Sequence, residues 1–294
     1  MREIAETIYV EDRLSVPPYD RGCNPGFVST SEGVVMIDCP MMPTDCMKWR
    51  REIEKHGQVR YIINTHHHPD HMAGNYFFPG TVISHEKVKA VFSTPIAGQV
   101  VSKPALANAK YPLEVTDGIR LEVQEGDPAG ISLMEGYCLR EPTITFSERL
   151  TLDVGRHSVE LIHMPGHTAG HIGVYVPRRK VFFAGDNFTN QVQPLLSNCL
   201  PFEWIESLKR IEAMDIDYVV PGHGEVCGLK EVTEFRQFIE TCIDMVRNAI
   251  KTGMTSEEAA ASISFENLYP AVHPGPQQQR FNVLWLYKVL SDAK

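Results

Sequence analysis

Four histidines and one aspartate fall within the seven residues Thr65-His66-His67-His68-Pro69-Asp70-His71, directly after the apolar run Tyr61–Ile63. Imidazole and carboxylate groups are common ligands of zinc, manganese and iron in proteins. A loop at the end of a strand can hold such side chains rigidly, so that they converge on one point. Taken alone, the segment could also be a histidine-rich surface run or a purification tag, and three later segments of the chain help to decide between these interpretations.

Three later segments have the same form, in which an apolar run leads into a candidate ligand in a glycine-containing turn. They are Val159–Met164 followed by Pro165-Gly166-His167, Val181–Ala184 followed by Gly185-Asp186, and Tyr218–Val220 followed by Pro221-Gly222-His223. Glycine lets the backbone turn sharply and approach a buried ion without a clash from a Cβ atom. Four such turns in one chain favour a metal site over a surface run.

With these turns in this order, the chain resembles the metallo-β-lactamase-fold hydrolase superfamily from about Ile8 to Val226. The resemblance implies two metal sites that share one carboxylate. The implied ligands are His66, His68 and His167 for one ion, Asp70, His71 and His223 for the second, and Asp186 as the bridge. The residue chemistry agrees, because two three-ligand clusters joined by a carboxylate leave positions open for water and substrate.

Two divalent ions about 3.5–4 Å apart can share a water and lower its pKa towards neutrality. We therefore expect a hydrolase in which a hydroxide bound by both metal ions cleaves a small ester, lactone or amide. Asp70 is the candidate catalytic residue, since it could orient the nucleophile or carry a proton to the leaving group. Zinc is the favoured ion, and manganese and iron are alternatives because the same ligands suit them. The alternative functions are an iron-dependent oxygenase or oxidoreductase, a weak β-lactamase, a thioester hydrolase, and a protein that keeps the fold without activity.

Where this chain departs from individual branches of the superfamily, the range of expected substrates and activities becomes smaller. Asp186 is a carboxylate where the lactamase subgroup usually has none, which argues against efficient β-lactamase activity. Glyoxalase II enzymes and sulfur dioxygenases have a glycine- and arginine-rich segment where this chain has Asn187–Gln191. This difference argues against a glutathione thioester substrate and against a sulfur dioxygenase. Acyl-homoserine lactonases have tyrosine at the position of Thr189, and flavodiiron proteins have glutamate at the position of His68. The first difference argues against an acyl-homoserine lactonase, and the second excludes the flavodiiron branch. The subfamily is therefore left open.

Five of the 12 histidines are assigned to metal, and the others are not. Strand alternation would point His67 away from the ions. His163 and His171 are expected to be structural, with support of a neighbouring ligand as the alternative. His85 also follows a strand, but the family pattern has no ligand there. The remaining histidines lie outside any ligand-like turn and are expected to be exposed: His56, His157 and His273.

The elements that must position these side chains are predicted from hydrophobic periodicity. Strands are expected over residues 8–10, 26–30, 33–38, 59–64, 81–84, 144–146, 150–154, 159–164, 181–184 and 218–220. Helices are expected over residues 44–56, 201–214, 231–250 and 277–290, with a short helix opened by the capping box at Thr255–Glu258. Residues 86–142 are expected to form a variable insertion near the site, helical up to Tyr111 and then broken by turns such as Asp117-Gly118.

Together with the resemblance, these elements predict an α/β fold, a four-layer αβ/βα sandwich of the metallo-β-lactamase type with a helical C-terminal extension. Residues 1–228 would be the catalytic domain, including the insertion at about 86–142, and residues 229–294 the helical extension packed on the same domain. Whether the insertion is a lid or an oligomer contact is left open, as is homo-oligomerisation.

Composition favours a small-molecule substrate over nucleic acid or a membrane. The net charge is −9, with 28 basic and 37 acidic residues, and no basic patch dominates. No apolar run approaches the roughly 18 residues that span a bilayer. Between Asp186 and Trp204 there is no lysine or arginine, which predicts an uncharged or cationic substrate. The apolar residues in and beside that stretch could line the site mouth or pack the following helix: Phe188, Leu195, Leu196, Leu200 and Phe202.

The cysteines and the first residues of the chain predict a cytoplasmic location. The seven cysteines are scattered and include no Cys-x-x-Cys pair, so they are expected to be reduced and mostly buried. Cys227 follows His223 by four residues but is not assigned as a ligand. The segment Met1–Glu6 contains acids and lacks the apolar core of a signal peptide.

Overall fold

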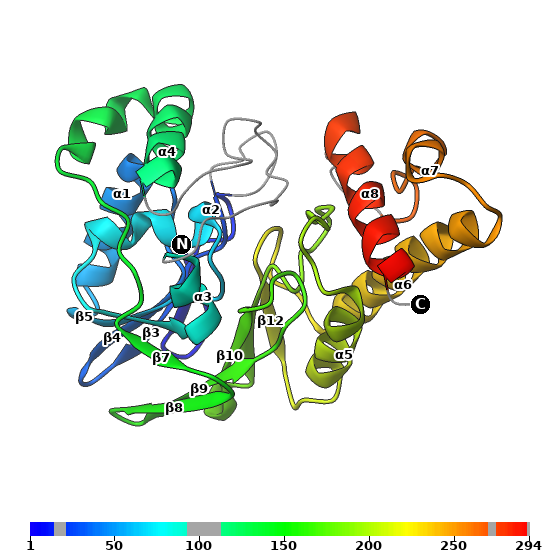
Figure 1. The fold of residues 1–294 in the computed structure, drawn as a ribbon. Helices are drawn as coiled ribbons and strands as arrows, with labels where there is room; N and C mark the ends of the chain where they lie inside the picture. The colour runs from blue at the N-terminus through cyan, green and yellow to red at the C-terminus, as the bar shows by residue number, and fades with distance from the viewer. Residues whose placement is uncertain (15–21, 93–112, 270–274, 293–294) are drawn as a thin grey trace.

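The computed structural model describes residues 1–292 apart from 15–21, 93–112 and 270–274 (Figure 1). Its first sheet has the strand order β1 to β7, antiparallel up to β4 and parallel from β4 to β7. These strands are β1 Arg2–Ala5, β2 Ile8–Val10, β3 Gly26–Thr30, β4 Gly33–Ile37, β5 Val59–Ile63, β6 Thr81–His85 and β7 Ile144–Phe146. The strands that periodicity predicts in this half are confirmed to within one residue at either end.

The second sheet has the order β12-β11-β10-β9-β8, parallel between β11 and β12 and antiparallel elsewhere. Its strands are β8 Arg149–Val154, β9 His157–His163, β10 Ile172–Val176, β11 Val181–Gly185 and β12 Tyr218–Pro221. Because β9 and β11 both run antiparallel to β10, and β12 runs parallel to β11, these three strands point the same way. Their carboxyl ends, which carry the later candidate ligands, therefore meet at one edge of the sheet.

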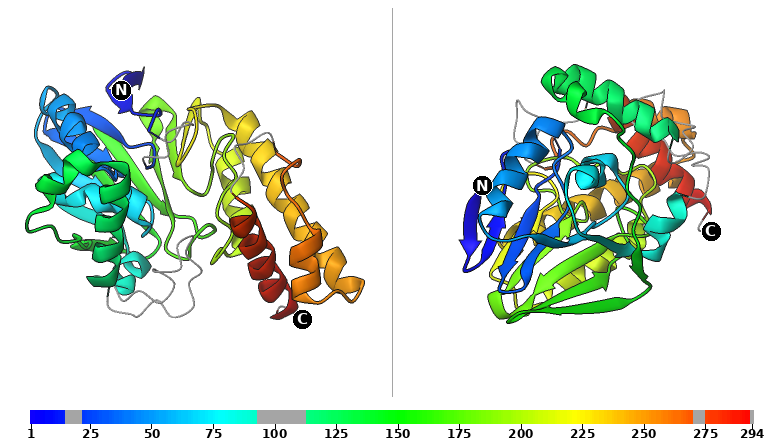
Figure 2. Two further views of the ribbon diagram at one scale, coloured as in Figure 1. Left: turned by 90° about the horizontal axis from the view of Figure 1, so that it is seen from above. Right: turned by 90° about the vertical axis from the view of Figure 1, so that its left-hand side faces the viewer.

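Helices cover the outer faces of both sheets (Figures 1 and 2). The helices of the described residues are α1 Pro43–Glu54, α2 Pro69–Met72, α3 Glu86–Val91, α4 Leu113–Gly126, α5 Pro201–Glu212, α6 Leu229–Lys251, α7 Ser256–Ser262 and α8 Pro276–Asp292, of which α2 lies at the carboxyl end of β5. Short 3₁₀ helices lie at η1 Ala73–Phe77, η3 Pro128–Met134 and η4 Pro177–Arg179. Helix α7 opens with the predicted capping box, in which Thr255 and Glu258 bond to each other's backbone.

Strand alternation builds three packed cores between these layers. Along β4, Val34 and Met36 lie in the core under α1 and α4, whereas Val35 and Ile37 lie in the core between the sheets. In β11, Phe182 packs towards α5, α6 and α8, and Phe183 packs between the sheets. The layers are thus helix, sheet, sheet and helix, which confirms the predicted four-layer α/β fold with a helical C-terminal region. The domain boundary at residue 228 stays a prediction.

Helix α4 and the segment that follows it in the insertion pack on the outer face of the first sheet. The predicted turn at Asp117-Gly118 is wrong, because α4 runs through both residues. Ile119 and Val123 are buried in the core beside α1, and this packing outweighs the cost of a helical glycine, about 1 kcal/mol. The predicted helix up to Tyr111 lies largely outside the described residues. Nowhere in the described chain is a helix long and apolar enough to cross a membrane.

Candidate metal centre

The structure brings all seven predicted ligand residues together at the carboxyl ends of β5, β9, β11 and β12. They form two groups in which one ligand-type atom of each residue lies within 4.8 Å of the others. The groups are His66, His68, His167 and Asp186, and Asp70, His71, Asp186 and His223. The first sheet supplies its residues from the β5 loop and α2, and the second sheet supplies the rest.

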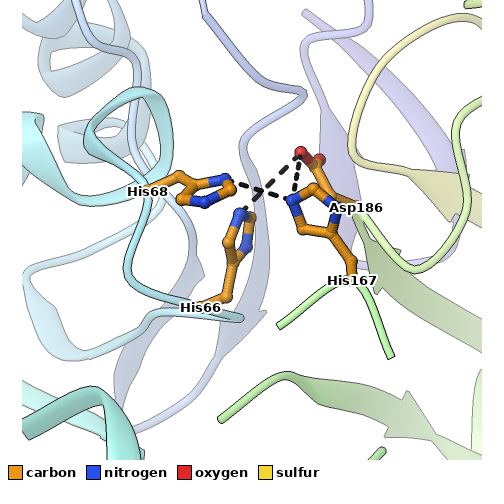
Figure 3. A group of neighbouring side chains, drawn as sticks. All are labelled: His66, His68, His167 and Asp186. Carbon is orange, nitrogen blue, oxygen red and sulfur yellow. Dashed lines mark hydrogen bonds and ion pairs between the residues drawn. The ribbon is translucent and has the colours of Figure 1, made fainter. Parts of the chain in front are cut away.

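The first group has the spacing of ligands around a tetrahedral ion. The nitrogens His68 Nδ1 and His167 Nε2 lie 3.1 Å apart, and His167 Nε2 lies 3.5 Å from Asp186 Oδ2. His66 Nε2 lies 3.8 Å from the same oxygen. Atoms that bind zinc at about 2.0–2.1 Å in a tetrahedron lie about 3.3 Å from one another. Figure 3 shows the three rings and the carboxylate pointing towards one common space.

The second group has similar spacing and uses the other oxygen of Asp186. His71 Nε2 lies 3.1 Å from Asp186 Oδ1, and His223 Nε2 lies 3.4 Å from it. Asp70 Oδ2 lies 3.5 Å from His71 Nε2 and 3.2 Å from His223 Nε2. Each oxygen of Asp186 therefore faces one group, which is the arrangement that a bridging carboxylate requires.

Buried polar atoms at the centre of both groups have no hydrogen-bond partner among the described residues. These atoms are His66 Nε2, His71 Nε2 and Asp186 Oδ1. A buried polar atom without a partner costs about 1–3 kcal/mol, so a folded protein rarely leaves several in one place. Nitrogen and carboxylate oxygen atoms that face one space are the donors that divalent zinc, manganese or iron would bind. The residues present therefore fit two divalent ions.

The histidines of the first group are held in the neutral form that binds metal. Burial lowers the pKa of His68 to about 3 and that of His167 to about 4. Burial, reinforced by the neighbouring His71, also lowers the pKa of His66 well below its usual value. A neutral ring keeps a lone pair for a cation, so these three side chains are ready to coordinate without first losing a proton.

Opposite charges dominate the second group. Burial opposes ionisation, but Asp186 and Asp70 raise the pKa of His223 to about 10. Burial likewise opposes ionisation of Asp70, whose pKa nevertheless falls to about 2 because of His71 and His223. The pKa of His71 is raised despite burial, because anionic neighbours surround its ring. Carboxylates paired with imidazolium rings form a compact cluster whose protons a metal ion would displace.

Asp38 joins the two groups from behind and was not identified from the sequence. His71 Nδ1 lies 2.8 Å from its Oδ2, and the Thr65 hydroxyl donates to the same oxygen at 2.7 Å. The Thr65 hydroxyl is in turn 3.1 Å from His66 Nδ1, and the Thr65 amide donates to Asp38 Oδ1. Asp38 has a φ of 53°, which is rare outside glycine and is often found at functional sites. Its signal in the sequence is only its position, directly after β4.

Asn187 holds the turn that carries His167 and was also not identified. Its side chain accepts from the His167 amide at 2.9 Å and donates to the Met164 carbonyl at 2.6 Å. Its carbonyl accepts from the Trp204 indole at 2.8 Å. A Cβ atom on Gly166 would lie 2.7–2.9 Å from Asn187 and Trp204 atoms, so the close approach of this turn requires glycine.

The predicted non-ligand histidines lie outside both groups, but not all are exposed. Neither group contains His67, His163, His171 or His85. His171 accepts from the Asn187 amide and stacks on His66, whereas the rings of His85 and His163 stack with centroids 3.9 Å apart. The prediction that His56 and His157 are exposed is wrong. His157 is 7% exposed, and His56 is half-buried with its ring against Tyr9, while His273 lies outside the described residues.

The cysteines are free and mostly buried, and one of them lies close to the site. All seven cysteines are free, and five of them are buried. Cys23, rather than Cys227, approaches the site, since it lies with Asp38 and His71 in a third compact group.

Phe188 and Leu196 are buried in the core beside α6, so they pack the following helices instead of lining the mouth of the site. Phe202 is 40% exposed, which leaves it available to line a surface.

Comparison with known proteins identifies the family. The family model described as the metallo-beta-lactamase superfamily matches residues 18–223. A linear primary-alkylsulfatase from Pseudomonas sp. is 22% identical over 261 residues, which are 80% of this chain and 49% of that protein. A hydroxyacylglutathione hydrolase from Brucella anthropi is 29% identical over 191 residues, or 65% of this chain and 55% of that protein. The chain thus spans about half the length of these relatives.

Solved structures agree on the fold. A metallo-beta-lactamase family protein from Thermus thermophilus superposes with a TM-score of 0.67 at 18% identity, covering 99% of this chain and 95% of that one. A stereoselective inverting sec-alkylsulfatase from Pseudomonas sp. superposes with a TM-score of 0.66 at 13% identity, covering 98% of this chain and 49% of that one. At these identities, the similarity shows a common fold.

Proposed function

The chain belongs to the metallo-β-lactamase superfamily, and we propose that it is a hydrolase with a dinuclear metal centre that cleaves a small ester, lactone or amide. Zinc is the favoured ion in this proposal, with manganese or iron as alternatives. The proposed ligands are His66, His68 and His167 at the first ion, Asp70, His71 and His223 at the second, and Asp186 between them.

The division of Asp186 between two groups carries this proposal. Its Oδ2 faces His167 at 3.5 Å and its Oδ1 faces His71 at 3.1 Å, so a single carboxylate contacts both groups. A single ion with an open position would need only three of these seven side chains. The buried unpartnered atoms at the centre, and neutral rings in the first group beside charged ones in the second, support the same conclusion.

Two divalent cations held there would lower the pKa of a shared water and polarise the oxygen of the bond to be cleaved. Within the second group, Asp70 is the residue best placed to act on protons. Its carboxylate is ionised, and its side chain, 28% exposed, is more accessible than those of His71 and Asp186. We assign it the role of orienting the attacking water and passing a proton to the leaving group.

Hydrolysis of a sulfate ester is the second candidate. The likeness to alkylsulfatases extends over more of this chain than the likeness to hydroxyacylglutathione hydrolases, and in the structural comparison it takes in nearly the whole chain. An alkyl sulfate is an anion, which conflicts with the absence of lysine and arginine between Asp186 and Trp204. For that reason the uncharged ester or lactone remains the first candidate.

The remaining parts of the proposal concern organisation and setting. Residues 1–228 would form the catalytic domain, and residues 229–294 a helical extension packed on it, since α6 and α8 share one core with α5 and the second sheet. The substrate would be a small molecule, with no nucleic-acid or membrane partner. The free cysteines favour a cytoplasmic location.

Elemental analysis and a substrate panel test this function together. Protein purified without added metal, and then reconstituted with zinc, manganese or iron, should hold about two metal equivalents. It should hydrolyse an aryl ester or a lactone faster than a thioester, a β-lactam, a primary alkyl sulfate or RNA. A stoichiometry that stays near one would exclude the dinuclear centre. Preference for the alkyl sulfate would favour the second candidate, and oxygen consumption without hydrolysis would favour an iron oxygenase.

A further inference from the structure

Asn24 links the first sheet to the turn that carries His223. It precedes β3, is 4% exposed, and faces the Pro221–Gly224 turn at the end of β12 in the second sheet. Its side-chain amide donates to the carbonyls of Pro221 at 3.0 Å and Gly224 at 2.6 Å. Its backbone amide donates to the carbonyl of Gly222 at 2.8 Å.

Asn24 thus satisfies three of the four carbonyls in this turn. The fourth, that of His223, accepts from the Asn190 amide at 2.8 Å. On the other side, the Gly222 amide donates to the carbonyls of Gly185 and Phe188. Two of the four turn residues are glycines without side chains to pack, so these hydrogen bonds fix the direction in which His223 points.

Asn24 is not among the residues that hold the histidines of the first group. Asp38 and Thr65 hold His66, and Asn187 holds the His167 turn. Cys23, immediately before Asn24, lies in a compact group with Asp38 and His71. The adjacent residues Cys23 and Asn24 therefore lie next to two residues of the second group: Cys23 is close to His71, and Asn24 bonds to the turn that carries His223.

We propose that Asn24 is a positioning residue for the second metal site, acting through the His223 turn. This rests on the proposed function, because it takes His223 as a ligand. Loss of the side-chain amide would remove two buried hydrogen bonds, to the carbonyls of Pro221 and Gly224, and the turn would be held less firmly. The ion held by Asp70, His71, His223 and Asp186 should then bind about 10- to 100-fold more weakly, the usual effect of removing a group that orients a ligand.

Titration of metal-free protein with zinc against a chelating dye tests this without any activity assay. Asn24→Ala should bind one equivalent as the wild type does and the other about 10- to 100-fold more weakly. Asn24→Ser keeps one donor in its hydroxyl, so its affinity for that equivalent should lie between those of the wild type and Asn24→Ala. The same variant provides the test if Asn24→Ala does not fold. The matched control is Asn282→Ala, because Asn282 is a buried amide that bonds to Leu196 and Pro194, outside the ligand turns.

Two outcomes separate this inference from the proposed function. A wild-type protein that binds only one equivalent would overturn the dinuclear centre and the role of Asn24 with it. A wild type with two equivalents, and an Asn24→Ala or Asn24→Ser protein that binds both with unchanged affinity, would overturn the role of Asn24 alone. Equal weakening of both steps in the Asn24 variants would also contradict it, since that result indicates a general structural effect.

Discussion

The imidazole of His71 donates from Nδ1 to Asp38 Oδ2 at 2.8 Å, and both side chains are almost completely buried. This bond fixes the ring so that Nε2 faces Asp186 and Asp70. Through the Thr65 hydroxyl the same oxygen of Asp38 also reaches His66, a member of the other group. One carboxylate thereby orients a histidine in each group.

Asp38→Asn should weaken binding of both metal equivalents, by about 10- to 100-fold each. The asparagine keeps the size of the side chain but removes the charge that favours the His71 bond and one acceptor that Thr65 and His71 share. Zinc competition with a chelating dye measures both steps. Weakening confined to one step would show that Asp38 supports only one group.

His66→Ala and His67→Ala form a matched pair of adjacent substitutions. His66 Nε2 faces Asp186, whereas His67 belongs to neither group. We expect His66→Ala to lose about one metal equivalent and nearly all hydrolysis, and His67→Ala to keep most of both. Metal analysis and initial rates measure the difference. Comparable losses in the two variants would show that the predicted order of ligands is wrong.

Gly222→Ala should disrupt the site through a single methyl group. A Cβ atom there would lie 2.0 Å from Asp186 Oδ1, which is far inside van der Waals contact. Asp186 or the His223 turn must move, so we expect loss of at least one metal equivalent. Gly275→Ala is the control, since its Cβ would meet nothing within 4 Å. Normal metal content in Gly222→Ala would mean that the carboxylate can move without loss of the site.

Much of the proposed site could be predicted because its candidate ligands are local signals. Each one follows an apolar strand in a short turn, and the strands β5, β9, β11 and β12 were predicted at those places. Asp38 and Asn24 could not be found in this way. The side chain of Asp38 bonds to residues 27 and 33 positions away, and that of Asn24 to residues 197 and 200 positions away, so only the tertiary fold reveals their partners.

The wrong prediction of a turn at Asp117-Gly118 and the open question of what Phe188 and Leu196 contact have the same origin. Gly118 is a local signal for a turn, but burial of Ile119 and Val123 against the first sheet keeps α4 helical. Phe188 and Leu196 follow a ligand turn and could have lined a pocket, yet the C-terminal helices cover them. In each case packing between distant segments decides the outcome, which periodicity within a short window does not register.

Asp127→Ala should destabilise the fold without removing metal. Helix α1 has no side-chain cap of its own, and Asp127 supplies one from the insertion by accepting from the Thr44 amide at 2.8 Å and its hydroxyl at 2.9 Å. Loss of a helix cap costs about 0.5–2 kcal/mol. Urea unfolding should show this loss, while zinc stoichiometry stays at the wild-type value. Loss of metal instead would show that the insertion supports the site.

His157 should make the protein less stable as the pH falls, independently of the metal centre. Burial, helped by Arg179 and Arg178, lowers the pKa of its ring in the folded state, whereas in the unfolded chain the pKa is about 6.5. The unfolded chain therefore binds more protons, so the contribution of His157 to stability is complete above about pH 6.5 and falls as the pH drops towards the folded pKa.

His157→Gln removes this contribution. The melting temperature of the wild type minus that of the variant should shrink between about pH 7 and pH 5. Effects of pH on the metal centre are common to both proteins and cancel in this difference. A difference that stays constant over that range would show that His157 titrates alike in the folded and unfolded states.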